Sequence, residues 1–339
     1  MSQEKESSYI PIDFTSVVNS HGEIVQSGET CRVSDLSEVF AWMRGTINSW
    51  YGWSNDGKGT MFDYLSVMKA KHDKWKFCFY KPEDMDSIFQ DGKVQIKANR
   101  IYQNLAWSLT GKTWSKAFAD KYRLGSSQQM DIHEKAEALQ FISDHFYVVY
   151  PRDRKYKNIL DDMLFMQEKF GIDVFLIDPW NAVKLPDGRT DEVLSDVFFE
   201  MKEMSLRTNT SMNIINHPRS LNDVKEKDGK YKVVNQFMVL GGSAWDMKMD
   251  SQYSIYRPER HLDPKDPKVH FYNLKQKQSE VVGVNRGSYE KIVFDVIKKQ
   301  YYFDGVNPMT GHVKESKLKQ GLVNFSEPQK ISDSDEVPF

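Results

Sequence analysis

The chain has 339 residues and a formal net charge of −2 at pH 7. This length allows one large domain or two small ones, and the near-neutral charge excludes a surface that attracts nucleic acid over its whole area. Cys31 and Cys78 are the only cysteines and lie far apart, which excludes a disulfide framework and favours a reducing compartment.

Neither a signal peptide nor a membrane span is expected. The N-terminal sequence MSQEKESSY is polar, and no apolar run approaches the roughly 18 residues that a membrane span needs. We therefore expect a soluble, cytoplasmic protein without membrane contact. Its expected parts are an N-terminal arm (1–40), a main domain (41–305), a short extension (306–322) and a disordered acidic tail (323–339).

Taken in chain order, the apolar patterns predict strands that alternate with helices. Expected strands are 9–14, one around 46–49, 75–80, 146–150, 174–178, 212–215, 269–277 and an alternating stretch, 290–302. Expected helices are 35–43, 61–68, 86–122 with a break at 110–112, 135–143, 159–170 ending at Gly171, and 193–206. This alternation predicts an α/β fold in which helices flank a mostly parallel sheet that ends in a C-terminal β-hairpin.

A glycine-rich loop precedes the second of these helices. Gly52, Gly57 and Lys58 match the phosphate-loop spacing G-x-x-x-x-G-K, in which backbone N–H groups surround an anion and the lysine reaches the outer phosphates. Gly59 stands where Ser or Thr normally follows the lysine, and Thr60 comes one residue later. The interpretation that competes with a nucleotide site is an ordinary glycine-rich turn. Asp56 lies inside the same loop.

Three polar residues follow predicted strands. Glu83 is a candidate base for an attacking water, Asp178 a candidate Mg²⁺ partner and His217 a candidate sensor of the γ-phosphate. Ligands of open α/β sheets bind beyond the strand carboxyl ends, which favours these roles. The alternatives are a solvated carboxylate, a strand-end aspartate that caps a turn, and a histidine packed at a strand end.

Four stretches together resemble one known family. The loop ending in GKGT, FCFYKPED, FLIDPWN, and IINHP followed by GGSAW are similar to the motor domain of replicative hexameric DNA helicases, in the Twinkle-like and phage primase–helicase branch of the RecA-like P-loop superfamily. The similarity covers about residues 40–305. It implies a RecA-like ATPase core that binds ATP and Mg²⁺, and an ATP hydrolase that translocates 5′ to 3′ as a DNA helicase.

The resemblance also implies residue roles. Lys58 would hold phosphates, Thr60 and Asp178 would hold Mg²⁺, Glu83 would activate water and His217 would sense the γ-phosphate. Lys275 and Lys277 lie where the family has a Lys-x-Arg pair that reaches the neighbouring subunit's γ-phosphate; lysine in place of arginine lacks the planar fork. The expected assembly is therefore a homo-oligomer, a hexameric ring.

Single-stranded DNA is the expected polymer partner. The resemblance assigns residues 241–250 to a DNA-contacting loop, and the charged segment before it is basic; the candidate residues are Arg219, Lys230, Ser243, Trp245 and Lys248. Trp245 is a candidate to stack on a base, and its alternative role is core packing.

Other functions fit parts of the sequence. A RecA-like recombinase or helicase loader would share the fold, and a weakly hydrolysing nucleotide-binding replisome scaffold would suit Gly59 and Lys277. The tail ends in SDSDEVPF, which resembles acidic tips that bind replication partners such as a polymerase or primase; a purely solubilising tail is the alternative.

Overall fold

The computed structural model describes residues 28–219, 224–277 and 279–313. Within them one large sheet has the strand order β11-β10-β9-β8-β1-β7-β6-β2-β5. Its strands are β1 (Thr46–Tyr51), β2 (Phe77–Tyr80), β5 (Phe146–Val148), β6 (Val174–Ile177), β7 (Ser211–Ile215), β8 (Ser251–Tyr256), β9 (Lys268–Gln276), β10 (Gly287–Asp295) and β11 (Gln300–Phe303). The strands from β5 to β8 are parallel, and β9, β10 and β11 continue the sheet in antiparallel pairs. This confirms the predicted α/β fold with a C-terminal hairpin.

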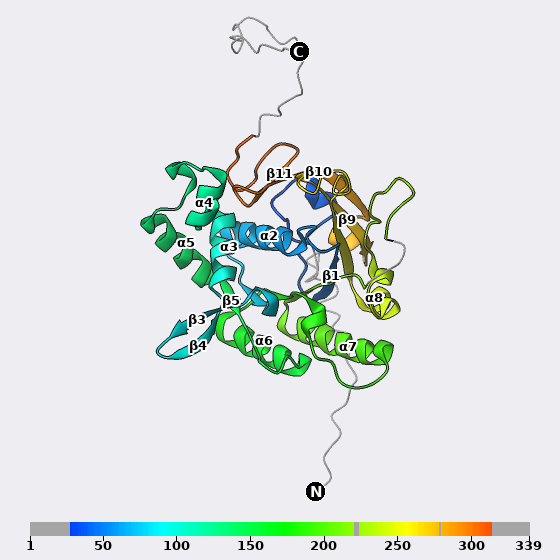
Figure 1. The fold of residues 1–339 in the computed structure, drawn as a ribbon. Coiled ribbons are helices and arrows are strands. Elements are labelled where there is room, and N and C mark those ends of the chain that lie inside the picture. Colours follow the sequence, from blue (N-terminus) through cyan, green and yellow to red (C-terminus); the bar gives the residue numbers. More distant parts are fainter. Residues whose placement is uncertain (1–27, 220–223, 278, 314–339) are drawn as a thin grey trace, which may run out of the picture.

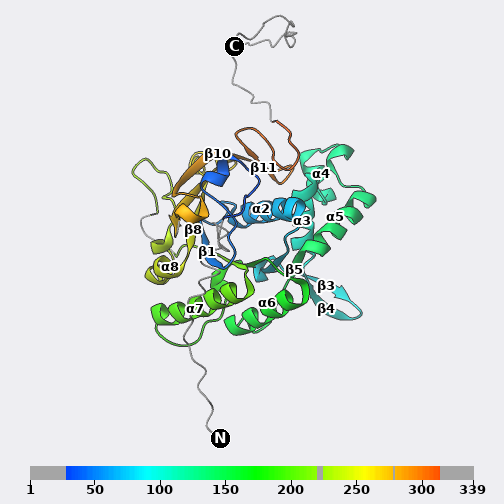
Figure 2. The ribbon, with the colours of Figure 1, turned by 180° about the vertical axis from the view of Figure 1, so that it is seen from behind.

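Helices cover both faces of this sheet (Figure 1). They are α2 (Lys58–Asp73), α3 (Asn99–Thr110), α4 (Lys116–Tyr122), α5 (Ile132–His145), α6 (Tyr156–Phe170), α7 (Thr190–Thr208), α8 (Gly242–Lys248) and α9 (Ser279–Val282). One core cluster joins the sheet to α2, α3 and α5, and a second joins the opposite face to α6, α7 and α8. The view from behind shows the same two helical layers (Figure 2).

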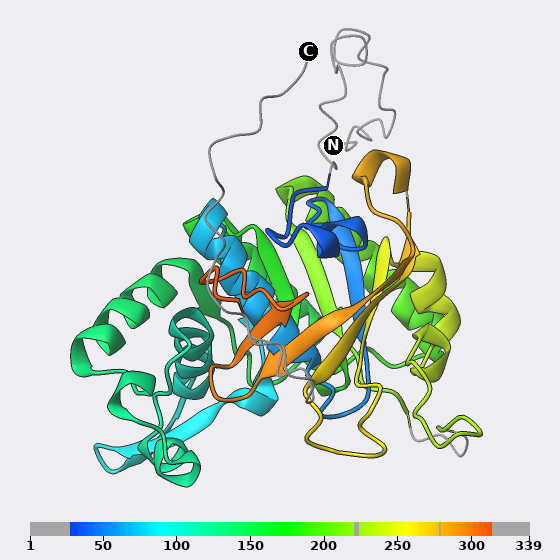
Figure 3. The same cartoon turned by 90° about the horizontal axis from the view of Figure 1, so that it is seen from above.

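Strand register aligns the predicted functional residues at one edge. Trp50 of β1 pairs with Ile215 of β7, and Ile177 of β6 pairs with both Ile214 of β7 and Tyr80 of β2. The residues that follow these parallel strands therefore lie next to one another. Figure 3 shows the segment 257–267 (yellow) at the same edge as the protruding hairpin of β3 and β4 (cyan), with α9 (orange) at the opposite edge.

The predicted helix 86–122 is wrong in its first part. Residues Asp86–Gln90 (β3) and Lys93–Lys97 (β4) form a separate antiparallel hairpin, and helix begins only at Asn99. Asp91 and Gly92 make the turn with positive φ at both positions (52° and 73°), the geometry for which Asp-Gly is preferred in two-residue hairpins. The alternating sequence on either side carried this signal.

Three other expectations need correction. The stretch 35–43 forms only a short 3-10 helix, Asp35–Glu38. The segment 241–245, expected as a flexible loop, opens α8, and β8 was not predicted because SQYSIY lacks an apolar run. Cys31, Leu36 and Phe40 lie in the first core cluster, so the described part of the N-terminal arm packs with the main domain. The predicted strand 9–14 and the acidic tail lie outside the described residues.

Candidate functional site: a phosphate loop at the sheet edge

The phosphate loop runs from the end of β1 into α2. Gly52 has a φ of 149°, and a Cβ there would lie 2.5 Å from the carbonyl oxygen of Ile255, so this position requires glycine. Gly57 has a φ of 88° and precedes the first residue of α2. The loop therefore ends at a helix N-terminus, where free N–H groups and the helix dipole favour an anion.

Lys58 is folded back into its own loop. Its Nζ donates to the carbonyl oxygens of Gly52 (2.8 Å) and Trp53 (3.0 Å) and lies 3.5 Å from Nδ1 of His217. Burial lowers the pKa of Lys58 to about 8, and it also lowers the pKa of His217, to about 4. His217 is therefore neutral at pH 7, and Lys58 is a cation close to its titration point.

Asp56 stabilises the loop from inside. Its side chain is 1% exposed, accepts from Nη1 of Arg260 (2.7 Å) and accepts from the backbone N–H of Trp53 (3.2 Å). Arg260 also lies over the ring of Tyr231, 5.5 Å from its centroid. Asp56 was predicted to contact the cofactor, but these contacts assign it to holding the loop.

Asp178 follows β6 and faces the first turn of α2. A Cβ built on Gly59 would lie only 2.8 Å from Oδ2 of Asp178. The aspartate therefore fills the space that the usual Ser or Thr side chain would need. Burial is the main cause that raises the pKa of Asp178, to about 6, while the neighbouring Lys81 ammonium acts in the opposite direction.

Lys81 and Asp63 complete this corner and were not predicted. The Lys81 ammonium is 2% exposed, contacts both Asp63 oxygens (2.7 and 2.9 Å) and lies 3.8 Å from Oδ2 of Asp178. Asp63 lies one helical turn after Gly59, so both face the ends of β2 and β6. Lys81 sits in the predicted FCFYKPED stretch, but its partner is distant in sequence.

Glu83 lies in a 3-10 turn (Pro82–Asp84) directly after β2. Its side chain is exposed, and its backbone carbonyl accepts from Nη2 of Arg100 (2.6 Å). The strand order puts Glu83 at the same edge as Asp178, with no printed contact between the two carboxylates. An exposed carboxylate here is open to water, as the role of a base requires.

A cavity of about 540 Å³ adjoins the phosphate loop. Its walls come from the loop and from distant segments: Asn55, Asp56, Gly57, Thr60, Tyr122, Arg257, Pro264, Lys265, Asp266, Pro267, Val269, Phe294, Val296 and Tyr301. The mixture of aromatic, aliphatic and charged groups is typical of a small-molecule site. The far walls carried no sequence signal, because the antiparallel strands and the loop before β9 bring them here.

The oxygen donors beside Asp178 suit a hard cation such as Mg²⁺, which usually takes one or two carboxylates plus phosphate and water. No group of three or more His, Cys, Asp or Glu side chains in the described ranges is arranged to hold a metal by itself. Gly59 is the α2 residue that faces Asp178, whereas Thr60 lines the cavity. The structure therefore supports Asp178 as a metal partner and gives Thr60 a position on the nucleotide side.

The predicted stacking of Trp245 on a base is wrong. Its side chain is fully buried, packs against Phe198 (centroids 4.4 Å apart) and Trp180 (5.6 Å), and donates from Nε1 to the Leu240 carbonyl (2.9 Å). Aromatic burial on the α7 side of the sheet outweighs any surface role. The core interpretation is therefore correct.

The other DNA candidates lie on surface segments after β7. Arg219 is exposed and its N–H donates to the Met238 carbonyl (3.0 Å), while Lys230 pairs with Asp228 (3.1 Å). Ser243 is exposed, but the hollow that it lines also contains carboxylates that would repel phosphate: Asp191, Glu192 and Asp196. In the described region, Arg219 is the candidate best placed for an anionic polymer.

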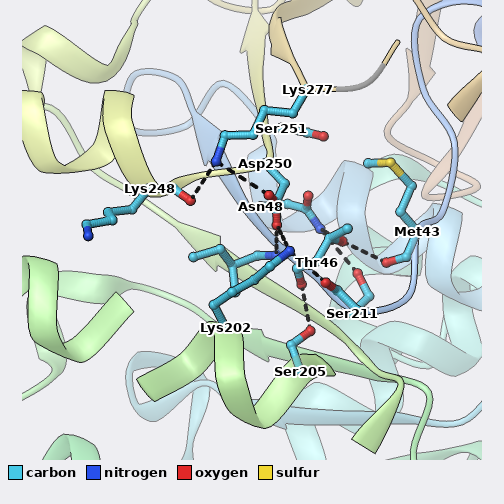
Figure 4. Close-up of polar contacts among 12 residues, drawn as sticks. Met43, Thr46, Asn48, Lys202, Ser205, Ser211, Lys248, Asp250, Ser251 and Lys277 are labelled. Carbon is cyan, nitrogen blue, oxygen red and sulfur yellow. Dashed lines mark hydrogen bonds and ion pairs between the residues drawn. The ribbon is translucent and has the colours of Figure 1, made fainter. Parts of the chain in front are cut away.

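Lys275 and Lys277 lie at the opposite edge of the sheet from the phosphate loop. Ser251 pairs with both Asn48 near the start of β1 and Gln276 of β9, which fixes their position. Lys277 Nζ lies 3.5 Å from Oδ1 of Asp250 and 3.4 Å from the Lys248 carbonyl, and Asp250 also binds Lys202 at 2.6 Å. Figure 4 shows this cluster, with the Lys248 side chain pointing away from it. The Lys275 ammonium donates to the Asp246 carbonyl.

The sequence matches no protein-family model, and comparison with curated proteins finds no match either. Solved structures match well. The solved ATPase domain of a phage helicase superposes with a TM-score of 0.63 at 12% identity, covering 85% of this chain and 94% of that one. The chain has the fold of a DnaB-like helicase motor domain. A structure of a DnaB-like replicative helicase and its interactions with primase matches with a TM-score of 0.61 at 10% identity, covering 86% and 67%.

The motor-domain fold agrees with the predicted RecA-like core. In the described residues, no helix is long and apolar enough to cross a membrane. Sequence reasoning found the loop, Asp178 and His217 because each follows a strand in a recognisable motif. It missed Asp63, Lys81 and Arg260, whose partners are set by folding alone.

Proposed function

We propose that this chain is an ATP-hydrolysing motor that moves along single-stranded DNA, a replicative DNA helicase of phage type. One observation carries the proposal: Lys58, Asp178 and His217 meet at the edge where a helix N-terminus, a phosphate loop and a cavity of nucleotide size adjoin. The motor-domain fold of the solved neighbours supports it.

In this proposal the loop N–H groups and Lys58 bind the outer phosphates, and the base and ribose occupy the cavity beside Thr60 and Tyr301. Bound Mg²⁺ would neutralise phosphate charge and would be held through Asp178. Glu83 orients and deprotonates the attacking water. Neutral His217, 3.5 Å from Lys58 Nζ, donates or accepts a hydrogen bond at the γ-phosphate and reports its loss to the segment that follows β7.

We further propose that sites are completed between subunits of a ring, a hexamer. Lys275 and Lys277 belong to the edge opposite the phosphate loop, so within one subunit they are far from its nucleotide; β1 alone spans roughly 20 Å at 3.3 Å per residue. A role toward a neighbouring subunit's γ-phosphate suits that separation. An ammonium there supplies a point charge without a bidentate fork.

The DNA contacts and the direction of movement, 5′ to 3′, belong to the same proposal. Trp53 of the phosphate loop supports a link between the two sites, because its Nε1 donates to the Lys232 carbonyl (2.8 Å) and its ring packs on Tyr231 (5.9 Å). A change at the phosphate loop would thereby reach the segment that contains Arg219 and Lys230. A replication partner, polymerase or primase, is proposed for the acidic tail, which lies outside the described residues.

The deciding experiment is ATP turnover with and without single-stranded DNA, with Lys58→Ala as the control for contaminating activity. Turnover that DNA stimulates and that the variant lacks supports the motor. DNA-independent or absent turnover in a protein that still binds nucleotide supports the alternative that Gly59 favours, a nucleotide-binding replisome scaffold. Electron microscopy on single-stranded DNA separates a ring helicase from a RecA-like filament or a loader.

A further inference from the structure

The first turn of α2 departs from the usual phosphate-loop pattern in a way that the fold matches with a buried cation. Gly59 has no side chain, Asp178 occupies the volume beside it, and the Lys81 ammonium lies 3.9 Å from the position of a Gly59 Cβ. A protein cation therefore stands in the corner where this class of site normally offers a hydroxyl to the metal.

Lys81 is held there by two elements. The Asp178 N–H donates to the Tyr80 carbonyl (2.9 Å), so Lys81 and Asp178 directly follow paired residues of β2 and β6. Asp63 reaches the same ammonium from α2 with two contacts, at 2.7 and 2.9 Å. With 2% of its side chain exposed, Lys81 has no water to replace these carboxylates.

The placement has an electrostatic consequence for a polyphosphate. Without a nearby cation, the Asp178 carboxylate would repel the phosphates that the loop attracts. The Lys81 ammonium, 3.8 Å from that carboxylate, offsets this repulsion permanently, whereas a divalent cation does so only when bound.

We propose that Lys81 is a fixed counter-cation of Asp178, which lets this site bind a nucleoside triphosphate with a reduced requirement for Mg²⁺. The inference rests on the proposed nucleotide site and adds a positioning residue to it. It also gives Gly59 a purpose, since a side chain there would displace Asp178 from Lys81.

The test measures binding of a fluorescent, non-hydrolysable ATP analogue in saturating Mg²⁺ and in excess EDTA. The quantity compared is the ratio of the Kd in EDTA to the Kd in Mg²⁺. We expect this ratio to rise at least tenfold in Lys81→Met, about 1.4 kcal/mol, while Lys81→Arg keeps it near the wild-type value. Electron paramagnetic resonance with Mn²⁺ should show tighter metal binding in Lys81→Met, because Asp178 has lost its competitor.

Matched variants separate this effect from damage to the fold. Asp63→Asn leaves Lys81 with Asp178 alone, so the ratio should stay equal or fall. The double variant Asp63→Asn/Lys81→Met keeps the summed charge of the three residues at −1, yet its ratio should rise as in the single lysine variant. Equal ratios in wild type, Lys81→Met and the double variant would overturn the inference. A wild type that binds no nucleotide in either condition would instead overturn the proposed nucleotide site.

Discussion

Arg260 donates a hydrogen bond to Asp56 from a position 204 residues further along the chain, and this buried ion pair fixes the phosphate loop. Removing one partner leaves the other charge uncompensated. We expect Arg260→Ala to lower the free energy of unfolding by about 3 kcal/mol, measured by urea denaturation. The double variant Asp56→Asn/Arg260→Met removes both charges and should recover most of this loss. Equal destabilisation in both variants would show that the ion pair is not the cause.

Nucleotide binding should weaken above pH 8. The Lys58 pKa is about 8 in the ligand-free protein because of burial, and bound phosphates favour the charged form, so the pKa rises on binding. Binding then takes up a proton in this range, and affinity should fall by up to about tenfold per pH unit above pH 8. Calorimetry at pH 8.5 in buffers of different ionisation enthalpy would detect the proton. A Kd that is constant from pH 7 to pH 9 would contradict the prediction.

Lys58→Ala and Glu83→Gln should both abolish turnover but differ in binding. The lysine variant loses a charge-assisted contact and should bind ATP at least about tenfold more weakly. The exposed glutamate acts on water in our proposal, so its variant should bind with a Kd close to that of the wild type. Steady-state phosphate release and equilibrium titration distinguish the two. Normal hydrolysis by Glu83→Gln would remove that residue from the mechanism.

Trp245→Ala should unfold the protein more easily without acting on DNA directly. The ring is fully buried between α7 and α8, and deletion of a core aromatic costs about 3–5 kcal/mol. Lys248→Ala, a change in the same helix whose side chain points away from the Asp250 cluster, should leave stability unchanged. Thermal unfolding compares the two variants. A Trp245→Ala protein of wild-type stability with weakened DNA binding would restore the stacking role.

Mixed assemblies test whether Lys277 acts on a neighbouring subunit. Lys58→Ala and Lys277→Ala proteins should each be inactive when alone. Combined in one ring, they would create interfaces where an intact Lys58 faces an intact Lys277, and turnover should return in part. Mixing each variant only with itself provides the control. No recovery on mixing, with ring formation verified by light scattering, would argue against a role between subunits.

The local pattern of the sequence was enough to predict the layered fold and the loop. Helical periodicity after Gly57, the apolar strand before Asp178 and the strand that ends at His217 are properties of short segments, and the structure reproduces each of them. The Asp91-Gly92 turn was equally local, but helical interpretation of the flanking residues obscured it.

Tertiary structure alone decided the partners. Lys81 is an ordinary lysine in the sequence, and only the pairing of β2 with β6 and the approach of α2 bring it to Asp178 and Asp63. Arg260 meets Asp56 because the loop before β9 returns to the phosphate loop. Trp245 carried the same letters whether it faced DNA or the core, and burial between two helices decided the outcome. Such contacts depend on burial and charge between distant segments, whereas sequence periodicity reports only on near neighbours.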